Sequence, residues 1–271
     1  MDNWTLDKNN VFINHTDIKV SYPDEGNSLC FQIEDNSPWF NQRNDLIETI
    51  ITKHKLNGNF LDIGGGNGFQ VKALEKLGAI KETYLVEPGY DGCLNAKTRG
   101  IRNVFCGLFQ DFDFKKYNVN ICGLFDVIEH IENDIQFLNE LYEKITKNTY
   151  VIINVPSLKS LWSEVDERSG HYRRYNKKDI KRILENTKFE LLDSGYHFFP
   201  YVIPLLILRV LPYNLGVKRS NEMIMKSESR NHNKKGLIQS FINYRNRQWI
   251  KKIAKGRTPI FGTSMFLVLK K

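Results

Sequence analysis

The ten residues from Phe60 to Phe69, FLDIGGGNGF, contain four glycines within five consecutive positions. Glycine loses more backbone freedom on folding than any other residue, so such a cluster needs a reason, and the close approach of a ligand to bare backbone provides one. An apolar run precedes the glycines and a helix-like run follows them. A glycine turn between a strand and a helix exposes the backbone and the helix N-terminus to a ligand. The stretch therefore predicts a ligand site at the carboxyl end of a strand.

The spacing of the glycines separates the nucleotides that could bind there. A nucleoside triphosphate loop has the pattern GxxxxGK[ST], but Phe69 and Gln70 follow these glycines and no lysine does. A dinucleotide loop has the pattern GxGxxG, whose last position would fall on Phe69. The pattern present is GxGxG, at Gly64, Gly66 and Gly68. The loop therefore matches neither phosphate-binding motif.

Two acidic residues near the loop indicate a positively charged ligand. Asp62 lies two residues before Gly64, where a carboxylate would repel a pyrophosphate and attract a cationic amino-acid group. Glu87 ends the next apolar run, before Pro88 and Gly89, and an acid at that place can accept hydrogen bonds from both ribose hydroxyls. S-adenosylmethionine carries an ammonium and a sulfonium but no phosphate. This ligand explains why both acidic residues lie near the loop. The alternative, a purely structural glycine turn beside a surface glutamate, leaves their positions unexplained.

Short apolar runs alternate with helix-like segments through the middle of the chain. The helix-like segments include 69–78 and 133–147, and the expected strands are 59–63, 83–87, 102–106, 119–124, 149–154 and 189–194. This alternation predicts an α/β fold with a parallel sheet covered on both faces. A last strand, 263–270, follows a long excursion over 196–260, and it can pair antiparallel with the strand at 189–194.

The stretches FLDIGGGNG, YLVEPG and FDVIEH together resemble the class I S-adenosylmethionine-dependent methyltransferases, over roughly residues 45–195 and again over 262–271. The resemblance implies a doubly wound, Rossmann-like, mostly parallel sheet of seven strands, six parallel and one antiparallel, with a helical insertion before the last strand. The expected parts are an N-terminal extension or lid (1–45), the methyltransferase core (46–195), a basic, partly apolar insertion (196–260) and the final strand (261–271).

The resemblance also implies roles for individual residues at the cofactor. The backbone at Gly64 and Gly66 would abut the methionine part, Asp62 would orient it, and Glu87 would hold the ribose. Gly107 and Leu108 would border the adenine. The residues expected to bind the cofactor are Asp62, Gly64, Gly66, Gly68, Glu87, Pro88, Gly107, Leu108 and Asp126.

The loop after the fourth strand, GLFDVIEHIEND (123–134), faces the transferred methyl group in this family. It lacks the [DN]PP[YF] pattern of adenine and amide N-methyltransferases, and Pro156 is followed by Ser157 in place of a nucleophilic cysteine. DVIEH resembles the ubiquinone-type O-methyltransferases and a set of bacterial small-molecule and glycan methyltransferases. His130 is the expected catalytic base, because a histidine titrates near neutral pH. The alternative is that His130 packs or caps the following helix.

The same loop also leaves a metal site open. Asp126, Glu129 and His130 share one helical turn, and His171 could supply a fourth ligand to a divalent ion. Small-RNA 2′-O-methyltransferases and some ubiquinone-pathway enzymes are similar here, but their pattern begins with glutamate where this chain has Asp126. The preferred interpretation contains no metal.

A second informative stretch is LWSEVDERSGHYRRY (161–175), which resembles bacterial methyltransferases linked with surface-polysaccharide or lipid-linked glycan synthesis. Arginine forks and aromatic faces suit the recognition of carboxylate, phosphate or sugar. The alternative is that Arg173 or Arg174 pairs with Asp166 or Glu167 and fixes the loop. The residues expected to contact the acceptor are Trp162, His171, Tyr172, Arg174 and Tyr175.

The net charge of +8 is unevenly distributed, since residues 209–257 hold 13 Lys and Arg and only two acids. Such a segment attracts phosphate, acidic lipid or nucleic acid, unless it is simply a solvated helical face. Residues 198–208, FFPYVIPLLIL, are eleven apolar residues, whereas a helix that spans a bilayer needs about 20. A buried helix is the first expectation for this run, and a dimer face or an interfacial anchor are the alternatives.

The sequence as a whole predicts an S-adenosylmethionine-dependent methyltransferase that O-methylates a small-molecule or glycan acceptor. An RNA methyltransferase and a non-catalytic cofactor-binding partner are the competing interpretations, and a nucleic-acid partner is less favoured. MDNWTLDKNN lacks a signal pattern, and Cys30, Cys93, Cys106 and Cys122 lack CxxC spacing, which favours reduced thiols. The expected location is the cytoplasm, with peripheral contact to an anionic membrane through 198–257.

Overall fold

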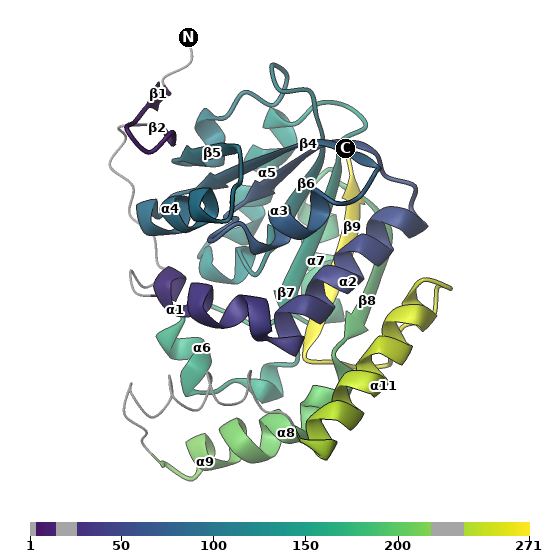
Figure 1. Ribbon diagram of the computed structural model, residues 1–271. Coiled ribbons are helices and arrows are strands. Elements are labelled where there is room, and N and C mark those ends of the chain that lie inside the picture. Colours follow the sequence, from purple (N-terminus) through teal and green to yellow (C-terminus); the bar gives the residue numbers. More distant parts are fainter. Residues whose placement is uncertain (1–3, 15–25, 218–235) are drawn as a thin grey trace.

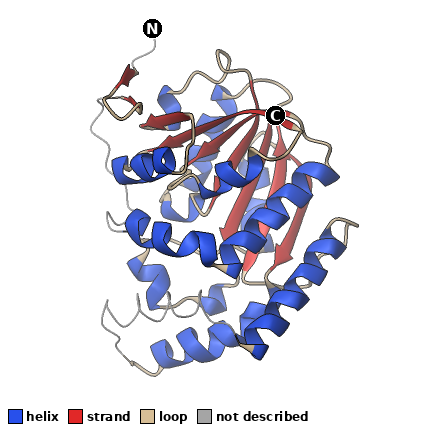
Figure 2. Cartoon of the chain, viewed as in Figure 1, coloured by secondary structure: helices blue, strands red, loops and turns tan. Residues whose placement is uncertain are grey.

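A single sheet of nine strands forms the centre of the protein, in the order β1-β2-β5-β4-β3-β6-β7-β9-β8 (Figure 1). The structure, a computed structural model, describes residues 4–14, 26–217 and 236–271. Helices cover both faces of the sheet (Figure 2). The strands are β1 (Thr5–Leu6), β2 (Phe12–Ile13), β3 (Gly58–Ile63), β4 (Ile80–Glu87), β5 (Asn103–Cys106), β6 (Val119–Phe125), β7 (Tyr150–Pro156), β8 (Glu190–His197) and β9 (Ser264–Lys270).

All seven strands expected from the sequence are present, but the expected total of seven is wrong. β1 and β2 extend the sheet beyond β5, with β2 parallel to β5 and β1 antiparallel to β2. Strands of two residues are too short to produce an alternating pattern, so the sequence does not reveal them. β9 pairs antiparallel with both β7 and β8, which confirms the expected antiparallel last strand.

The helices connect these strands and shield them from water. They are α1 (Gly26–Ile33), α2 (Pro38–Lys53), α3 (Phe69–Leu74), α4 (Tyr90–Thr98), α5 (Asp134–Lys144), α6 (Glu164–Arg168), α7 (Lys177–Asn186), α8 (Val202–Leu205), α9 (Leu211–Asn214) and α11 (Leu237–Ile253). Short turns are the 3-10 turns η1 (Glu34–Asn36), η2 (Phe109–Asp111), η3 (Ile128–His130), η4 (Lys159–Leu161) and η5 (Phe199–Tyr201), and the π turn η6 (Leu206–Val210). The Ser37 side chain caps α2, and Pro38 follows at its first position.

Two hydrophobic clusters, one on each face of the sheet, make up the core. Successive side chains of a strand point to opposite faces, so Phe60 and Leu61 of β3 each join a different cluster. Because helices cover both faces, the central strands are apolar at nearly every position. The expected boundary at residue 45 falls inside α2, whose Leu46, Ile47 and Ile50 belong to the same cluster as Phe60.

The strand order reverses between β3 and β6, and this reversal positions the site. β4 and β5 lie on one side of β3, whereas β6 and β7 lie on the other. The connections after β3 and β6 therefore leave in opposite directions and open a crevice at the carboxyl ends of the strands. The glycine loop follows β3, Glu87 ends β4, and Asp126 follows β6, so the sequence motifs meet at this crevice.

The apolar run 198–208 is helical, but the expectation that it is buried is wrong. It continues through η5, α8, η6 and α9, and Ile203, Ile207 and Leu211 are 67%, 57% and 54% exposed. Val202 and Val210 are buried, so this helix rests on the domain with one side only. Residues 218–235 of the expected basic insertion lie outside the described residues. In the described part of the chain, no helix combines the length and the apolar character that crossing a membrane requires.

Candidate functional site

A cavity of about 1000 Å³ lies at the carboxyl ends of the central strands and gathers most of the expected site residues. Those that line it are Gly64, Gly66, Glu87, Pro88, Gly107, Leu108, Asp126, His130, His171, Tyr172 and Arg174. Those that do not line it are Asp62, Gly68, Trp162 and Tyr175. The cavity also touches elements that the sequence analysis left outside the core, because α1, α2 and the insertion contribute Asn27, Trp39, Phe40, Arg43, Leu205 and Arg209.

The glycine loop has a backbone that side chains would disturb. Gly64, Gly66 and Gly68 have φ angles of +70°, +48° and +72°, a region that L side chains rarely adopt. A Cβ atom on Gly64 would also lie 2.8 Å from a methyl carbon of Val127. Gly68 lies behind the loop, where a Cβ would be 3.0 Å from the side chain of Ala96, and it begins α3. Gly68 therefore shapes the turn, while Gly64 and Gly66 face the cavity.

Glu87 fastens the loop to the end of β4. Its Oε2 accepts a hydrogen bond from the N–H of Gly66 at 2.9 Å, and its Oε1 accepts one from the N–H of Gly89 at 2.8 Å. Burial raises the pKa of Glu87, and these hydrogen bonds oppose the rise. The carboxyl group lines the cavity at the place where the sequence analysis expects the ribose.

Asp62 is a buried carboxyl group that lacks a partner. It is 1% exposed, and neither of its oxygens has a hydrogen-bond partner among the described residues. Burial raises its pKa to about 8, while the nearby Arg43 opposes this rise and Glu87 adds to it. A buried, unpartnered carboxyl group directly behind a ligand loop fits a bound group that donates hydrogen bonds or carries positive charge.

Asp126 is held by a network that the sequence analysis did not find. Its backbone has a left-handed φ of +57°, Arg43 of α2 forms an ion pair with its carboxylate, and Asn154 donates to Oδ1 at 2.7 Å. His197 Nε2 lies 2.6 Å from Asn154 Oδ1, and burial lowers the pKa of His197 to about 3, so this ring is neutral. Arg43 lies three residues before Leu46, and residues at this spacing share one side of a helix. This position on the apolar side of α2 is the one sequence signal that could have indicated that Arg43 is buried.

Glu129, His130 and His171 meet at the other side of the cavity. One ligand atom from each of the three lies within 4.8 Å of the others. Glu129 is fully buried with both carboxyl oxygens unpartnered among the described residues, and burial together with Asp126 raises its pKa. Burial and the neighbouring His171 lower the pKa of His130 to about 4. His130 is therefore neutral at physiological pH, with one unprotonated ring nitrogen, and is a weaker base than an ordinary histidine.

A sequence profile of a methyltransferase domain matches residues 37–194, more than half of the chain. This chain belongs to that methyltransferase family. The expected class I methyltransferase is thereby confirmed, while membership in the ubiquinone-type or glycan-associated group stays a prediction. A search of curated protein sequences finds no match.

Solved structures share the fold of this methyltransferase. The plantazolicin methyltransferase BamL, solved with a triazolic substrate analogue and SAH, is 16% identical with a TM-score of 0.55, covering 93% of this chain and 92% of its own. Phosphoethanolamine N-methyltransferase 2 of Haemonchus contortus, with S-adenosyl-L-methionine, is 17% identical with a TM-score of 0.54, covering 93% and 58%. A chain of the Haloferax volcanii complex between the Trm112 activator and a methyltransferase is 11% identical with a TM-score of 0.55, covering 91% and 93%. At these identities the likeness shows the fold alone.

The loop 161–175 of the methyltransferase is fixed by an internal ion pair, as the alternative expectation had it. Arg174 Nε donates to Asp166 Oδ1 at 2.7 Å, and Arg174 Nη1 donates to the carbonyl oxygen of Ser157 at 3.1 Å. Asp166 Oδ1 also lies 3.0 Å from His171 Nδ1, so one buried carboxylate orients both side chains. Trp162 lies outside the cavity and hydrogen-bonds the side chain of Tyr213. Of the five expected acceptor residues, His171, Tyr172 and Arg174 line the cavity, and Asp166 orients both His171 and Arg174.

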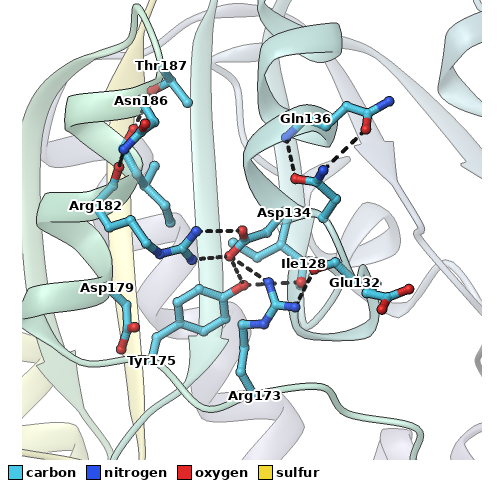
Figure 3. A network of polar contacts seen from close by, with 12 residues as sticks. Ile128, Glu132, Asp134, Gln136, Arg173, Tyr175, Asp179, Arg182, Asn186 and Thr187 are labelled. Carbon is cyan, nitrogen blue, oxygen red and sulfur yellow. Dashed lines mark hydrogen bonds and ion pairs between the residues drawn. The ribbon is translucent and has the colours of Figure 1, made fainter.

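Tyr175 has a structural position, which contradicts its expected contact with the acceptor. It is fully buried, and its hydroxyl lies 3.1 Å from the carbonyl oxygen of Ile128 and 3.0 Å from Asp134 Oδ2, with its proton shared between these acceptors (Figure 3). Asp134 also pairs with Arg182 and Arg173. The network joins the loop at 173–175 and α7 to η3 and the start of α5. The aromatic residue type of Tyr175 gave no sign that its side chain points into the protein.

Tyr175→Phe removes only the hydroxyl from this network and tests its structural role. We expect the free energy of unfolding to fall by about 1–2 kcal/mol, since two buried acceptors lose their shared donor. The matched control is Tyr172→Phe, because Tyr172 is 49% exposed, and it should change stability by less than about 0.5 kcal/mol. Urea denaturation followed by circular dichroism measures both, and equal midpoints for the two variants would contradict the assignment.

Proposed function

We propose that this S-adenosylmethionine-dependent methyltransferase transfers the methyl group to a hydroxyl of a small-molecule or glycan acceptor. The observation that carries the proposal is that one cavity contains both the glycine loop with Glu87 and, across from them, His130 with Tyr172. Donor and acceptor can therefore share a single space, as a direct displacement requires. The sequence motifs supply the donor half, and the neutral His130 supplies a base for the acceptor half.

At the donor end, we assign binding to the bare backbone of Gly64 and Gly66 and to the carboxyl group of Glu87. Asp62 would receive the ammonium group, directly or through a water, since it does not itself line the cavity. Gly107 and Leu108 would border the adenine. Arg43 lines the cavity and is the cation nearest to the carboxyl groups of Asp62 and Asp126, so it is placed to bind the methionine carboxylate.

At the acceptor end, the protein aligns the hydroxyl and removes its proton. Bound S-adenosylmethionine supplies a methyl group on a positively charged sulfur, which is a strong electrophile. His130 is neutral and lines the cavity, so it can take the proton of the attacking hydroxyl. The backbone N–H of Tyr172 donates to the carbonyl oxygen of Glu129 at 2.8 Å, which holds the acceptor loop against η3.

The N-terminal helices would act as the lid of this site. Asn27 of α1 and Trp39, Phe40 and Arg43 of α2 line the cavity, so these helices cover the cofactor end. We keep the expected cytoplasmic location, the glycan-associated subgroup and the peripheral membrane contact as proposals.

Asp62→Asn tests the donor site through the pH dependence of binding. Because the pKa of Asp62 in the free protein is about 8, its carboxyl group is protonated at pH 7, and an incoming ammonium group would drive the proton off. The affinity of the wild-type protein for S-adenosylmethionine should therefore rise between pH 6 and pH 8, with proton release (about one proton per site). Asp62→Asn should bind about tenfold more weakly at pH 8 and lose this part of the pH dependence.

Isothermal calorimetry in buffers of different ionisation enthalpy measures both the affinity and the released proton. Asp111→Asn, an exposed carboxyl group outside the cavity, is the matched control and should behave as the wild type. Unchanged affinity and unchanged proton release in Asp62→Asn would show that Asp62 does not face the ligand.

His130→Ala tests the acceptor chemistry together with the function itself. The wild-type protein, incubated with methyl-labelled donor and fractionated lipid, glycan, RNA and metabolite pools, should label an alkali-stable ether in a non-RNA pool. His130→Ala should lower turnover by about 100-fold or more, with donor affinity changed less than about threefold. His54→Ala, a histidine outside the cavity, is the control. Label in RNA alone would support an RNA methyltransferase, and label in no pool would support a non-catalytic cofactor-binding partner. Either result would contradict the proposal.

A metal-assisted reaction is a second candidate, because the structure brings Glu129, His130 and His171 together. The buried, unpartnered carboxyl group of Glu129 and the Asp166 carboxylate behind His171 Nδ1 are both features of metal-binding sites. A divalent ion held there would supply a Lewis acid beside the acceptor hydroxyl. Asp126 is engaged with Arg43 and Asn154, so it is not required as a ligand.

Titration with Mg²⁺, Mn²⁺ or Zn²⁺ distinguishes the two candidates. If the cluster binds metal, calorimetry shows one site per chain, and Glu129→Gln weakens it by about tenfold or more. Glu132→Gln, an exposed acid of the same cavity, is the matched control and should leave the affinity unchanged. If activity persists in the presence of a chelator and calorimetry detects no binding of any of the three ions, the metal-assisted reaction is contradicted. His130 then acts as a base without a metal.

A further inference from the structure

Exposed apolar side chains of this protein are concentrated on one part of the surface. Of the sixteen large hydrophobic side chains that are exposed in the described residues, twelve lie between Ile203 and Phe261. We define the insertion face by ten of them: Ile203, Leu206, Ile207, Leu208, Leu211, Leu215 and Val217 in and just after α8 to α9, and Leu237, Phe241 and Tyr244 of α11. A contiguous apolar patch on a protein surface marks an interaction site.

The two parts of the insertion face lie at the same end of the molecule. Figure 1 shows α8, in green, beside the first turns of α11, in yellow-green, while α9 continues away from α11 along the same end of the molecule. The contact is polar and direct, since the hydroxyl of Tyr201 donates to Asn243 Oδ1 at 2.9 Å, and Gln239 Nε2 donates to the same hydroxyl at 3.2 Å. Tyr201 belongs to η5, which leads directly into α8. These hydrogen bonds therefore join the start of the helical segment that contains α8 and α9 to the first turns of α11.

The charged side chains of the described insertion are all positive. The described segments 198–217 and 236–257 contain seven Lys and Arg and no Asp or Glu. Along α11 and the turn after it the exposed side chains change from Leu237, Phe241 and Tyr244 to a cationic set consisting of Arg245, Arg247, Lys251, Lys252 and Lys255. Apolar side chains at one end of a helix and cations at the other are the combination that binds an anionic bilayer surface.

A second copy of the chain fits this face less well than a bilayer does. Pairing of two copies through the same patch would place the cationic set of one protomer near that of the other. No acidic side chain within the described insertion could offset this repulsion. An anionic lipid surface complements both the apolar and the cationic parts.

The same helix that carries the insertion face also lines the cavity. Leu205 and Arg209, four residues apart, lie on the cavity side, whereas Ile203, Ile207 and Leu211, also four residues apart, lie on the exposed side. The segment therefore forms one wall of the cavity, and the outer side of this wall is apolar. A guanidinium at this wall suits a phosphate or carboxylate group on the acceptor.

We propose that the insertion face docks on an anionic membrane and that the methyl acceptor is an amphiphile with an anionic head group, whose head enters the cavity past Leu205 and Arg209. The docking stands on the surface alone, whereas the identity of the acceptor rests on the proposed function. The apolar part of the acceptor stays in the bilayer, and only its polar head reaches His130.

Vesicle sedimentation tests the docking. The wild-type protein should bind vesicles of phosphatidylcholine mixed with phosphatidylglycerol about tenfold more tightly than vesicles of phosphatidylcholine alone, and added salt should weaken the binding. The double variant Ile207→Glu/Leu211→Glu should lose binding to both vesicles. Lys251→Glu/Lys252→Glu should lose the preference for the anionic lipid. Leu6→Glu/Leu192→Glu, at two exposed apolar residues of β1 and β8, is the matched control and should bind as the wild type.

Circular dichroism and calorimetry with S-adenosylmethionine show that each variant is folded with an intact donor site. Wild-type protein that remains in the supernatant with both vesicle types overturns the docking. So does a dimer, detected by light scattering, that Ile207→Glu/Leu211→Glu dissociates, because a second copy then covers the face. Methyl label found only in water-soluble products overturns the amphiphilic acceptor and leaves docking in place. A failure to bind S-adenosylmethionine overturns the proposed function without affecting the vesicle result.

Discussion

The site depends on carboxyl groups that the fold keeps buried next to a backbone without side chains. Glu34, Asp62, Glu87 and Glu129 are each less than 9% exposed, and burial raises the pKa of every one of them. A buried carboxylate is unfavourable unless a cation or several hydrogen bonds compensate it. Glu87 obtains backbone N–H groups and Glu34 obtains Arg99 at 2.9 Å, but Asp62 and Glu129 keep unpartnered oxygens in the described part of the protein. A protein of net charge +8 thus contains a locally acidic cavity, which favours a cationic donor over a phosphate-bearing one.

Arg43 is the cation around which these acids are arranged. It is 5% exposed, it pairs with Asp126, and its charge opposes the rise in the pKa of Asp62 and of Glu129. It comes from α2, whose apolar side packs on the sheet, so the position of this charge is fixed by core packing. The left-handed backbone of Asp126 is held from the other side by Asn154, whose partner is the neutral His197 of β8. Residues from three separate elements, α2, β7 and β8, therefore determine where one loop carboxylate points.

The part of the site that the sequence predicted is the part whose residues are neighbours in the chain. Asp62 and the glycines are close neighbours in the chain, and Glu87 ends the next strand, so their spacing was enough to predict that they lie at one edge of the sheet. Arg43, Asn154 and His197 meet only because β6, β7 and β8 lie in the order that the folded sheet imposes, and no local pattern encodes that meeting. Tyr175 is buried outside the cavity, whereas Arg174 lines the cavity but is paired with Asp166. Residue type alone does not reveal which way a side chain points or which partner it has. The prediction that the apolar run 198–208 is buried was also wrong. Hydrophobicity indicates that a segment favours an apolar environment, but it does not identify the surface that covers the segment.

The chain keeps two electrostatic systems of opposite sign apart, and salt acts on them differently. The carboxyl groups of the cavity are buried, so dissolved ions screen them weakly, whereas the cations of α11 are exposed and lose most of their reach beyond about 8 Å at physiological ionic strength. Binding of the donor should therefore be nearly independent of salt while attachment through the insertion face is sensitive to it. The wall from Leu205 to Leu211 stands between the two systems, with Arg209 directed to the cavity and Ile207 to the outside. In the proposed docking, a head group with negative charge would be attracted by the outer system and would pass the guanidinium at the wall. Only an uncharged hydroxyl on that head group would then approach the acids around His130 without repulsion.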